Sequence, residues 1–185
     1  MKIIPLSEGT FTVDKTKKFI PFDKEKDKLQ DRPVGSLLVE IQPFCIITQK
    51  DIIVIDTGLG FEASSGKMQI HQNLIDNGIN PAEVTKVLLS HLHKDHSGGI
   101  TTKFLPAHEL RLSFPQATYY VHHDELLQHF EAAESDYDME EVALLKQSEN
   151  LVMYGNEGVI DDYIFYQHTG GHSKFHCVFW IKEEN

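Results

Sequence analysis

The sequence predicts an α+β fold, in which antiparallel strands lead into buried strands that alternate with amphipathic helices. Residues 35–49 alternate apolar and polar side chains, which is typical of strands with one face on a core. Residues 52–55 are apolar throughout and residues 86–90 centre on an apolar run, so both predict buried strands. Apolar residues recur at helical spacing in residues 67–77 and 134–149.

The first part of the chain predicts strands on either side of one charged segment. Residues 2–13 predict a first strand and turn, whereas residues 14–33 are rich in Lys and Asp and predict a solvated loop or arm. The apolar patch at residues 19–22 is expected to pack on the body of the protein, with packing on another subunit as the alternative. In the strand that follows, one face is expected to carry Leu37, Val39 and Ile41.

The two helical segments that follow have recognisable ends. Gly78 is expected to end the first helix. Residues 80–83 read Asn-Pro-Ala-Glu, which predicts a capped helical turn. The apolar face of the first helix is expected to carry Met68, His71, Leu74 and Ile75. His71 is therefore interpreted as a packing residue.

The second half of the chain predicts short strands and a further helix. Residues 118–121 predict a strand, and Asp124 is expected to cap the helix that follows. The apolar stripe of that helix is expected to carry Leu126, Leu127 and Phe130. His122 and His123 are interpreted as polar residues at the strand end, because adjacent residues face opposite ways. His168 and His176, which flank a Gly-Gly turn, are interpreted as structural or supporting residues.

Composition limits the class of protein. The 185 residues predict one domain, residues 1–185. The net charge of −11 argues against a nucleic-acid or anionic-membrane partner and favours a small-molecule substrate. No apolar run approaches membrane-spanning length and the N-terminus lacks the apolar core of a secretory signal, so the cytoplasm is the expected location. Cys45 and Cys177 lie in separate apolar runs and are expected to be small buried hydrophobes.

One short segment carries the chemistry. Residues 91–96 read His-Leu-His-Lys-Asp-His, directly after the apolar run of residues 86–90 and before Gly98 and Gly99. We expect a loop at the end of a buried strand, in which His91 and His93 point to the same side. The loop can offer nitrogen ligands to one metal ion. Asp95 and His96 can offer a carboxylate and a nitrogen to a neighbouring ion. Imidazole and carboxylate suit Zn²⁺, and also Fe or Mn. His172, in a second Gly-rich turn before an apolar run, is the expected third ligand of the first ion.

These residues resemble the HxHxDH signature of the metallo-β-lactamase fold hydrolases. Residues 54–58 resemble the family's Asp-Thr-Gly turn, and residues 169–172 resemble its later Gly-His turn. The resemblance covers roughly residues 34 to 180. It implies an αββα sandwich, two zinc ions in the complete protein with iron or manganese as alternatives, and a lid or specificity role for residues 134–149.

The resemblance ends before the family's pattern is complete. Relatives carry a bridging Asp and one more His after the strand at which this chain stops, at Asn185. Asp161 and Asp162 precede His172 and are poor substitutes. Three explanations compete: a fragment of a longer protein, a natural truncation, or a site completed by a partner chain. The first is favoured, since a sandwich without its closing strands exposes an apolar face, and a longer chain is then expected to melt at a higher temperature.

The expected reaction is metal-dependent hydrolysis. A metal-bound hydroxide would attack the carbonyl of an ester, lactone, thioester or amide. Asp95 is expected to help move the proton to the leaving group. Asp56, at the end of the strand formed by residues 52–55, is expected to accept hydrogen bonds and to orient the metal loop, with a turn-forming cap as the alternative.

Three other functions stay open. A single-iron dioxygenase acting on a persulfide resembles the same motif, and one iron per chain with oxygen uptake would select it. A phosphodiesterase shares the motif too, although the acidic chain argues against a long nucleic-acid substrate. An inactive fragment or binding protein is the third, and the missing ligands permit it. Diiron flavoproteins are disfavoured, because His93 occupies the position of their usual carboxylate.

Overall fold

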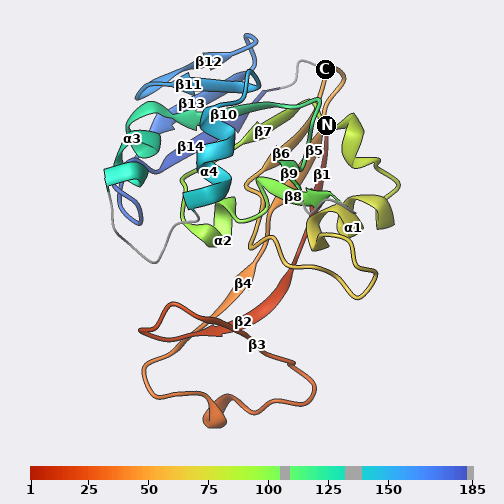
Figure 1. The fold of residues 1–185 in the computed structure, drawn as a ribbon, viewed down its shortest axis with the longest axis vertical. Coiled ribbons are helices and arrows are strands. Elements are labelled where there is room, and N and C mark those ends of the chain that lie inside the picture. The colour runs from red at the N-terminus through yellow and green to blue at the C-terminus, as the bar shows by residue number, and fades with distance from the viewer. Residues whose placement is uncertain (105–108, 132–138, 183–185) are drawn as a thin grey trace.

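The computed structural model of the chain describes residues 1–104, 109–131 and 139–182 (Figure 1). Its centre is a six-stranded sheet in the order β1-β5-β6-β7-β10-β11. The strands are β1 (Lys2–Pro5), β5 (Phe44–Ile47), β6 (Ile52–Ile55), β7 (Lys86–Leu88), β10 (Thr118–His122) and β11 (Leu151–Tyr154). β1, β5 and β6 pair antiparallel, whereas β6, β7, β10 and β11 pair parallel. The carboxyl ends of β6, β7 and β10 therefore meet at one edge.

A second sheet packs on one face of the first. It contains β12 (Glu157–Ile160), β13 (Ile164–His168) and β14 (Cys177–Ile181), all antiparallel. The core between the sheets contains Ile46, Ile53, Leu88, Tyr120, Tyr154, Ile160, Tyr163, Ile164 and Cys177. On the outer face of this second sheet, the side chains of Val159 and Trp180 are 45% and 48% exposed.

The helices cover the other face of the six-stranded sheet. They are α1 (Gln69–Asp76), α3 (His123–Glu131) and α4 (Met139–Lys146). Side-chain alternation divides the two cores: Val87 packs toward the helices, and Leu88 toward the second sheet. The helix-side core also includes Cys45, Val54, Ile70, Leu74, Tyr119, Val121, Leu126, Val142 and Leu145. This helix–sheet–sheet arrangement confirms the predicted fold class.

Smaller elements complete the body. They are the 3₁₀ turns η1 (Leu29–Asp31) and η2 (Pro81–Glu83), the short helix α2 (Lys94–Ser97), and a hairpin of β8 (Thr101–Phe104) and β9 (Glu109–Leu112). No helix in the described ranges has the length and apolar character needed to cross a bilayer. Cys45 and Cys177 are buried and unpaired with each other, which confirms the predicted packing role.

A three-stranded sheet extends from the body as an arm (Figure 1). Its strands are β2 (Gly9–Val13), β3 (Phe19–Pro21) and β4 (Leu37–Ile41), in the order β3-β2-β4. Residues 14–33 therefore belong to an arm, as one of the two predicted forms had it, but the strand β3 within them was not predicted. Its apolar residues pair with β2, and the ring of Phe19 packs on that of Phe11. Leu37 is 65% exposed, because β4 begins in the arm and becomes buried only toward its end at Ile41.

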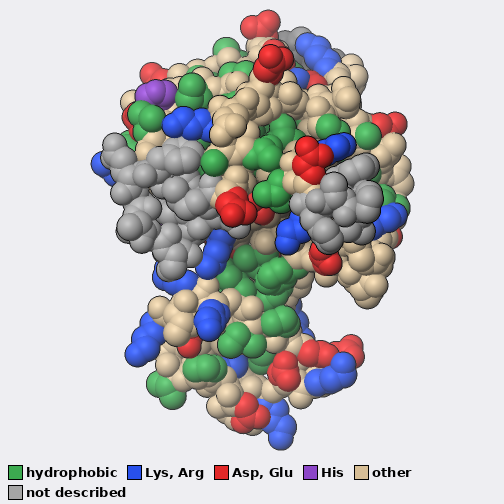
Figure 2. Space-filling view, in the orientation of Figure 1, with side chains coloured by type: hydrophobic (Ala, Val, Ile, Leu, Met, Phe, Trp, Pro, Cys, Tyr) green, Lys and Arg blue, Asp and Glu red, His purple; other side chains and the backbone are tan. Residues whose placement is uncertain are grey.

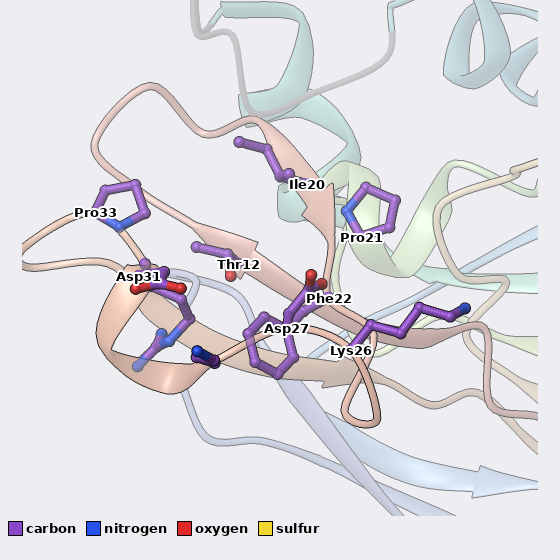
Figure 3. A pocket seen from close by; sticks show the side chains of 10 residues that line it. Thr12, Ile20, Pro21, Phe22, Lys26, Asp27, Asp31 and Pro33 are labelled. Carbon is purple, nitrogen blue, oxygen red and sulfur yellow. The ribbon is translucent and has the colours of Figure 1, made fainter.

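The arm meets the body at a cluster of hydrophobic side chains and carries a hollow of its own. Figure 2 shows hydrophobic side chains gathered where arm and body join. The arm contains a pocket of about 260 Å³. Figure 3 shows side chains that line it, among them Thr12, Phe22, Asp27 and Asp31. The ten residues that line it all lie between Thr12 and Pro33, so the pocket is separate from the histidine-rich segment of residues 91–96.

Local predictions met with mixed success. The capped turn is confirmed, because Asn80 and Glu83 exchange the reciprocal hydrogen bonds of a capping box. The predicted face of α1 is partly wrong: Ile70 and Leu74 are fully buried, whereas Ile75 is 39% exposed. Asp124 does not cap α3 but lies in its first turn, where its carboxylate accepts from the ring of His123.

Two predictions reach residues that the structure leaves out. Val142 and Leu145 are fully buried in α4, as their helical spacing predicts. Residues 134–138 of the predicted lid segment lie outside the described residues, so the lid role stays a prediction. The side chain of Phe130 lies outside them too.

Candidate metal centre

The metal loop, residues 91–97, begins three residues after β7 and ends in α2. The prediction of an irregular loop is therefore correct only to His93, which precedes the first turn of α2. The hydroxyl of Ser97 donates to the carbonyl oxygens of Leu92 and His93 at 2.9 and 3.1 Å, which closes this turn. Asp95 and His96 consequently leave the extended backbone and point elsewhere than His91 and His93.

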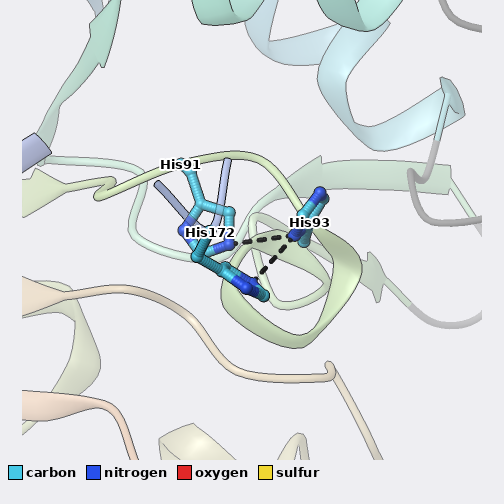
Figure 4. A group of neighbouring side chains, drawn as sticks. All are labelled: His91, His93 and His172. Atoms are coloured by element: carbon cyan, nitrogen blue, oxygen red, sulfur yellow. Dashed lines mark hydrogen bonds between the residues drawn. The ribbon is translucent and has the colours of Figure 1, made fainter. Parts of the chain in front are cut away.

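Three imidazole rings converge from two distant segments (Figure 4). His93 Nδ1 lies 3.2 Å from His91 Nε2 and 3.1 Å from His172 Nε2, and the three ligand atoms all lie within 4.8 Å of one another. Two ligands at 2.0–2.1 Å from a tetrahedral ion are separated by about 3.3 Å. The observed spacings therefore fit three nitrogen ligands around one ion, and this donor set suits Zn²⁺, Fe or Mn.

His91 is held in the form that a metal ligand requires. Burial lowers its pKa, and the nearby rings of His96, His93 and His172 lower it further, so its ring is neutral. The hydroxyl of Ser90 lies 2.8 Å from Asp56 Oδ2 and 3.0 Å from His91 Nδ1. Because its one hydrogen goes to the carboxylate, Ser90 accepts from His91 Nδ1–H, and the lone pair of Nε2 faces His93.

Asp95 and His96 define an adjacent position. His96 Nε2 lies 3.6 Å from Asp95 Oδ2, close to the separation of two ligands on one ion. His96 Nδ1 donates to Asp56 Oδ2 at 2.8 Å, which leaves Nε2 directed toward Asp95. Burial alone would lower the pKa of His96, but the hydrogen bond to Asp56 and the charges of Asp56 and Asp95 outweigh it and raise that pKa.

Asp56 makes the hydrogen bonds expected of it. It follows β6 in a left-handed conformation with φ of 57°, and its Oδ1 accepts from the backbone N–H of Ser90 at 2.8 Å. The same carboxylate thus contacts Ser90, which directly precedes the metal loop, and His96, which lies in its helical part. The next residue, Thr57, donates its N–H to the carbonyl oxygen of His96 at 2.6 Å. Gly60 packs against Gly98 so closely that a side chain at Gly60 would overlap that backbone.

Sequence reasoning missed Glu125, and it anticipated His176 only as a structural or supporting residue. Glu125 is 1% exposed and contacts both the metal loop and the turn that carries His172. The ring of His176 lies 5.4 Å from that of His91, and burial lowers its pKa. Glu125 lies in the first turn of a helix and belongs to no sequence motif. Its position directly after β10, at the edge where the carboxyl ends of the parallel strands meet, was the one signal that it lies near the site.

The other histidines lie outside the three-ring group. His122 stacks on Phe175 with ring centroids 5.4 Å apart and pairs with Asn156 through Nε2 at 3.1 Å. His71 Nε2 bonds to the carbonyl oxygen of Ser113 at 3.0 Å. In the part of the chain that the structure describes, the cluster suited to a metal contains His91, His93 and His172.

Comparison with known proteins gives one family and one fold. Residues 36–185 match the family model described as the metallo-beta-lactamase superfamily. No curated protein matches the sequence. Among solved structures, a probable metal-dependent hydrolase from Staphylococcus aureus is 21% identical, with a TM-score of 0.75 over 99% of this chain and 69% of that one.

Two further structures are similar. AidC, described as a dizinc quorum-quenching lactonase, is 21% identical with a TM-score of 0.73 over 99% of this chain and 68% of its own. The hydrolase AbOPH is 24% identical with a TM-score of 0.68 over 98% of this chain and 66% of its own. The chain thus spans about two thirds of the length of these structures, and at such identities the likeness shows the fold.

Proposed function

Because the chain belongs to the metallo-beta-lactamase superfamily, we propose that it is a metal-dependent hydrolase acting on a small carbonyl substrate. The observation that carries the proposal is the convergence of His91, His93 and His172 beside the pair formed by Asp95 and His96. We propose zinc as the metal and two ions in the complete site, with iron or manganese as alternatives.

The residues of the site are proposed to have different roles in hydrolysis. A divalent ion held here would polarise a carbonyl and lower the pKa of a water so that it can attack at neutral pH. His91, His93 and His172 would hold the first ion, and Asp95 and His96 would hold part of the second. Asp95 would also carry the proton to the leaving group. Asp56 would fix the rings through Ser90 and His96.

An open groove supports a substrate with an apolar part. It measures about 480 Å³ and borders the metal loop at Lys94 and Gly98, although no proposed metal ligand lines it. Its remaining polar lining is Lys17 and Lys18. Its apolar lining comes from the arm and from the turn after β6, namely Phe19, Ile20, Leu59 and Phe61. The net charge of −11 supports a small molecule rather than a nucleic acid as partner. A lactone with an acyl chain, the class named for AidC, is therefore the first substrate to test.

The test combines metal content with turnover. Elemental mass spectrometry of the purified chain should find zinc, and acyl lactones and aryl esters should be hydrolysed in proportion to it. Asp95→Ala should lower kcat/KM about 10²–10⁴-fold, whereas Asp76→Ala, at the exposed end of α1, should leave it unchanged. Unchanged turnover in Asp95→Ala at equal metal content would rule out its role. One iron per chain with oxygen uptake on a persulfide would favour the dioxygenase instead.

A further inference from the structure

The two segments that carry the three histidines need a common support. His91 and His93 belong to the metal loop, and His172 belongs to the glycine turn, residues 169–173. The glycine turn contains two left-handed glycines, Gly170 and Gly171, with φ of 62° and 94°. His172 itself is exposed, so packing around its own ring does not fix its position.

The carboxylate of Glu125 connects these segments. Its Oε1 accepts from the backbone N–H of Leu92 at 3.0 Å, and its Oε2 accepts from the hydroxyl of Ser173 at 2.7 Å. Leu92 lies between His91 and His93, and Ser173 directly follows His172. One side chain therefore holds the residue next to each ligand, with one oxygen for each segment.

The surroundings make this contact demanding. Glu125, Leu92 and Ser173 are 1%, 0% and 5% exposed, so water does not replace the hydrogen bonds if either is lost. A buried carboxylate is costly unless both oxygens are bonded, and here both are. A second hydrogen bond between the two parts of the chain, from the N–H of Cys177 to the carbonyl oxygen of Ser90 at 2.9 Å, lies on the strand side of both segments and does not involve the residues next to His172.

We propose that Glu125 is a positioning residue that sets the distance between the metal loop and the glycine turn, and so the affinity of the three-histidine site for its metal. This inference rests on the proposed function only in taking the three rings as ligands. Glu125 touches neither the rings nor the position of the metal, so its effect passes through Leu92 and Ser173.

The experiment measures metal affinity rather than turnover. Zn²⁺ affinity of the full chain is determined by competition with a chromogenic chelator, and the visible absorption of bound Co²⁺ reports the coordination geometry. Glu125→Ala should raise the Kd for Zn²⁺ about 10–100-fold, the effect expected for residues that orient metal ligands, and should alter the Co²⁺ spectrum. Glu125→Gln should change both less, because its amide oxygen can accept from Leu92 while its NH₂ donates to Ser173.

A matched control separates positioning from stability. Asp51 is another buried carboxylate, but it lies at the opposite end of β6, where it pairs with Lys86 at 2.6 Å. Asp51→Asn should lower Tm without changing the Kd for Zn²⁺. If Glu125→Ala does not fold, Ser173→Ala provides the measurement, and it should raise the Kd while Tm changes little.

The outcomes are distinct. Zinc binding by the unaltered chain, with weaker binding in Glu125→Ala or Ser173→Ala and none of that weakening in Asp51→Asn, supports the inference. Equal affinities in the unaltered chain and in both variants overturn the inference and leave the proposed function standing. An unaltered chain that binds no zinc, cobalt, iron or manganese overturns both.

Discussion

Glu8 provides a test of how the turn after β6 is supported. Its Oε2 accepts from the backbone N–H of Leu59 at 2.6 Å, while its Oε1 is buried without a hydrogen-bond partner. The carboxyl group packs so tightly against Gly58 that a side chain there would overlap it. Burial raises the pKa of Glu8 to about 7, and the hydrogen bond from Leu59 offsets only part of that rise. Below about pH 7 the folded protein therefore favours the protonated carboxyl of Glu8.

The sign and size of the effect follow from this pKa. Between the ordinary value of 4.5 and about 7, the folded chain binds a proton that the unfolded chain releases. The contribution of Glu8 to the free energy of unfolding is thus fully present below pH 4.5 and is lost as the pH rises through about 7. At 1.36 kcal/mol per pH unit, the loss amounts to about 3 kcal/mol.

Glu8→Gln should remove this dependence, because its uncharged amide can accept from Leu59 at every pH. Urea unfolding of metal-free protein, followed by the fluorescence of Trp180, gives the free energy of unfolding from pH 5 to 8. Over this range the variant should gain roughly 2.5 kcal/mol relative to the unaltered chain. A constant offset from the buried NH₂ changes the level but not this slope. Glu40→Gln, at an exposed carboxylate, is the control, and parallel curves for the unaltered chain and Glu8→Gln would refute the reasoning.

Three further outcomes are expected. Gly60→Ala should lower Tm and weaken Zn²⁺ binding, because a side chain there overlaps the backbone of Gly98. Gly78→Ala has a similar positive φ but open space around it, and should cost only about 1 kcal/mol of stability. Equal losses of stability in the two variants would contradict this. Asp51→Ala leaves the buried ammonium of Lys86 with Asp161 as its remaining partner and should cost about 3 kcal/mol in urea unfolding. The exposed Asp23→Ala should change the free energy of unfolding little, and similar costs for the two variants would argue against a buried pair. Removal of zinc by a chelator should lower Tm, and readdition at 1,000 times the Kd should restore about 4 kcal/mol, unless the metal binds the unfolded chain equally well.

The features that the sequence predicted are those encoded within a few residues. The capping box spans the four residues from Asn80 to Glu83, and the separation of His91 from Asp95 by the bend depends on local backbone direction. The face of α1 was harder, because Ile70 and Ile75 are equally apolar and the neighbouring elements decide which one is buried. β3 was missed because its charged flanks resemble a solvated loop until β2 is present to pair with it.

The supporting residues of the site depend on contacts that the chain order does not reveal. Glu8 is 51 residues from Leu59, and Glu125 is 33 residues from Leu92 and 48 from Ser173. Neither glutamate belongs to a motif, and each is defined by burial, which composition cannot locate. The metal-binding histidines could be recognised because several residues that bind metals lie close together in one short segment. A single carboxylate that binds backbone N–H groups leaves no such pattern.

The residues that stabilise the fold and the residues of the candidate metal site lie at opposite ends of β6 and β7. At the entry to these strands, Asp51 binds Lys86, Thr85 and the hydroxyl of Tyr163, which pins the second sheet onto the first. At the exit, Asp56 and the metal loop bring imidazole and carboxylate groups together. The strands are four and three residues long, so these ends lie roughly 10 Å apart at 3.3 Å per residue. A well-bonded entry allows the exit to hold the three imidazole rings around a position that suits a cation.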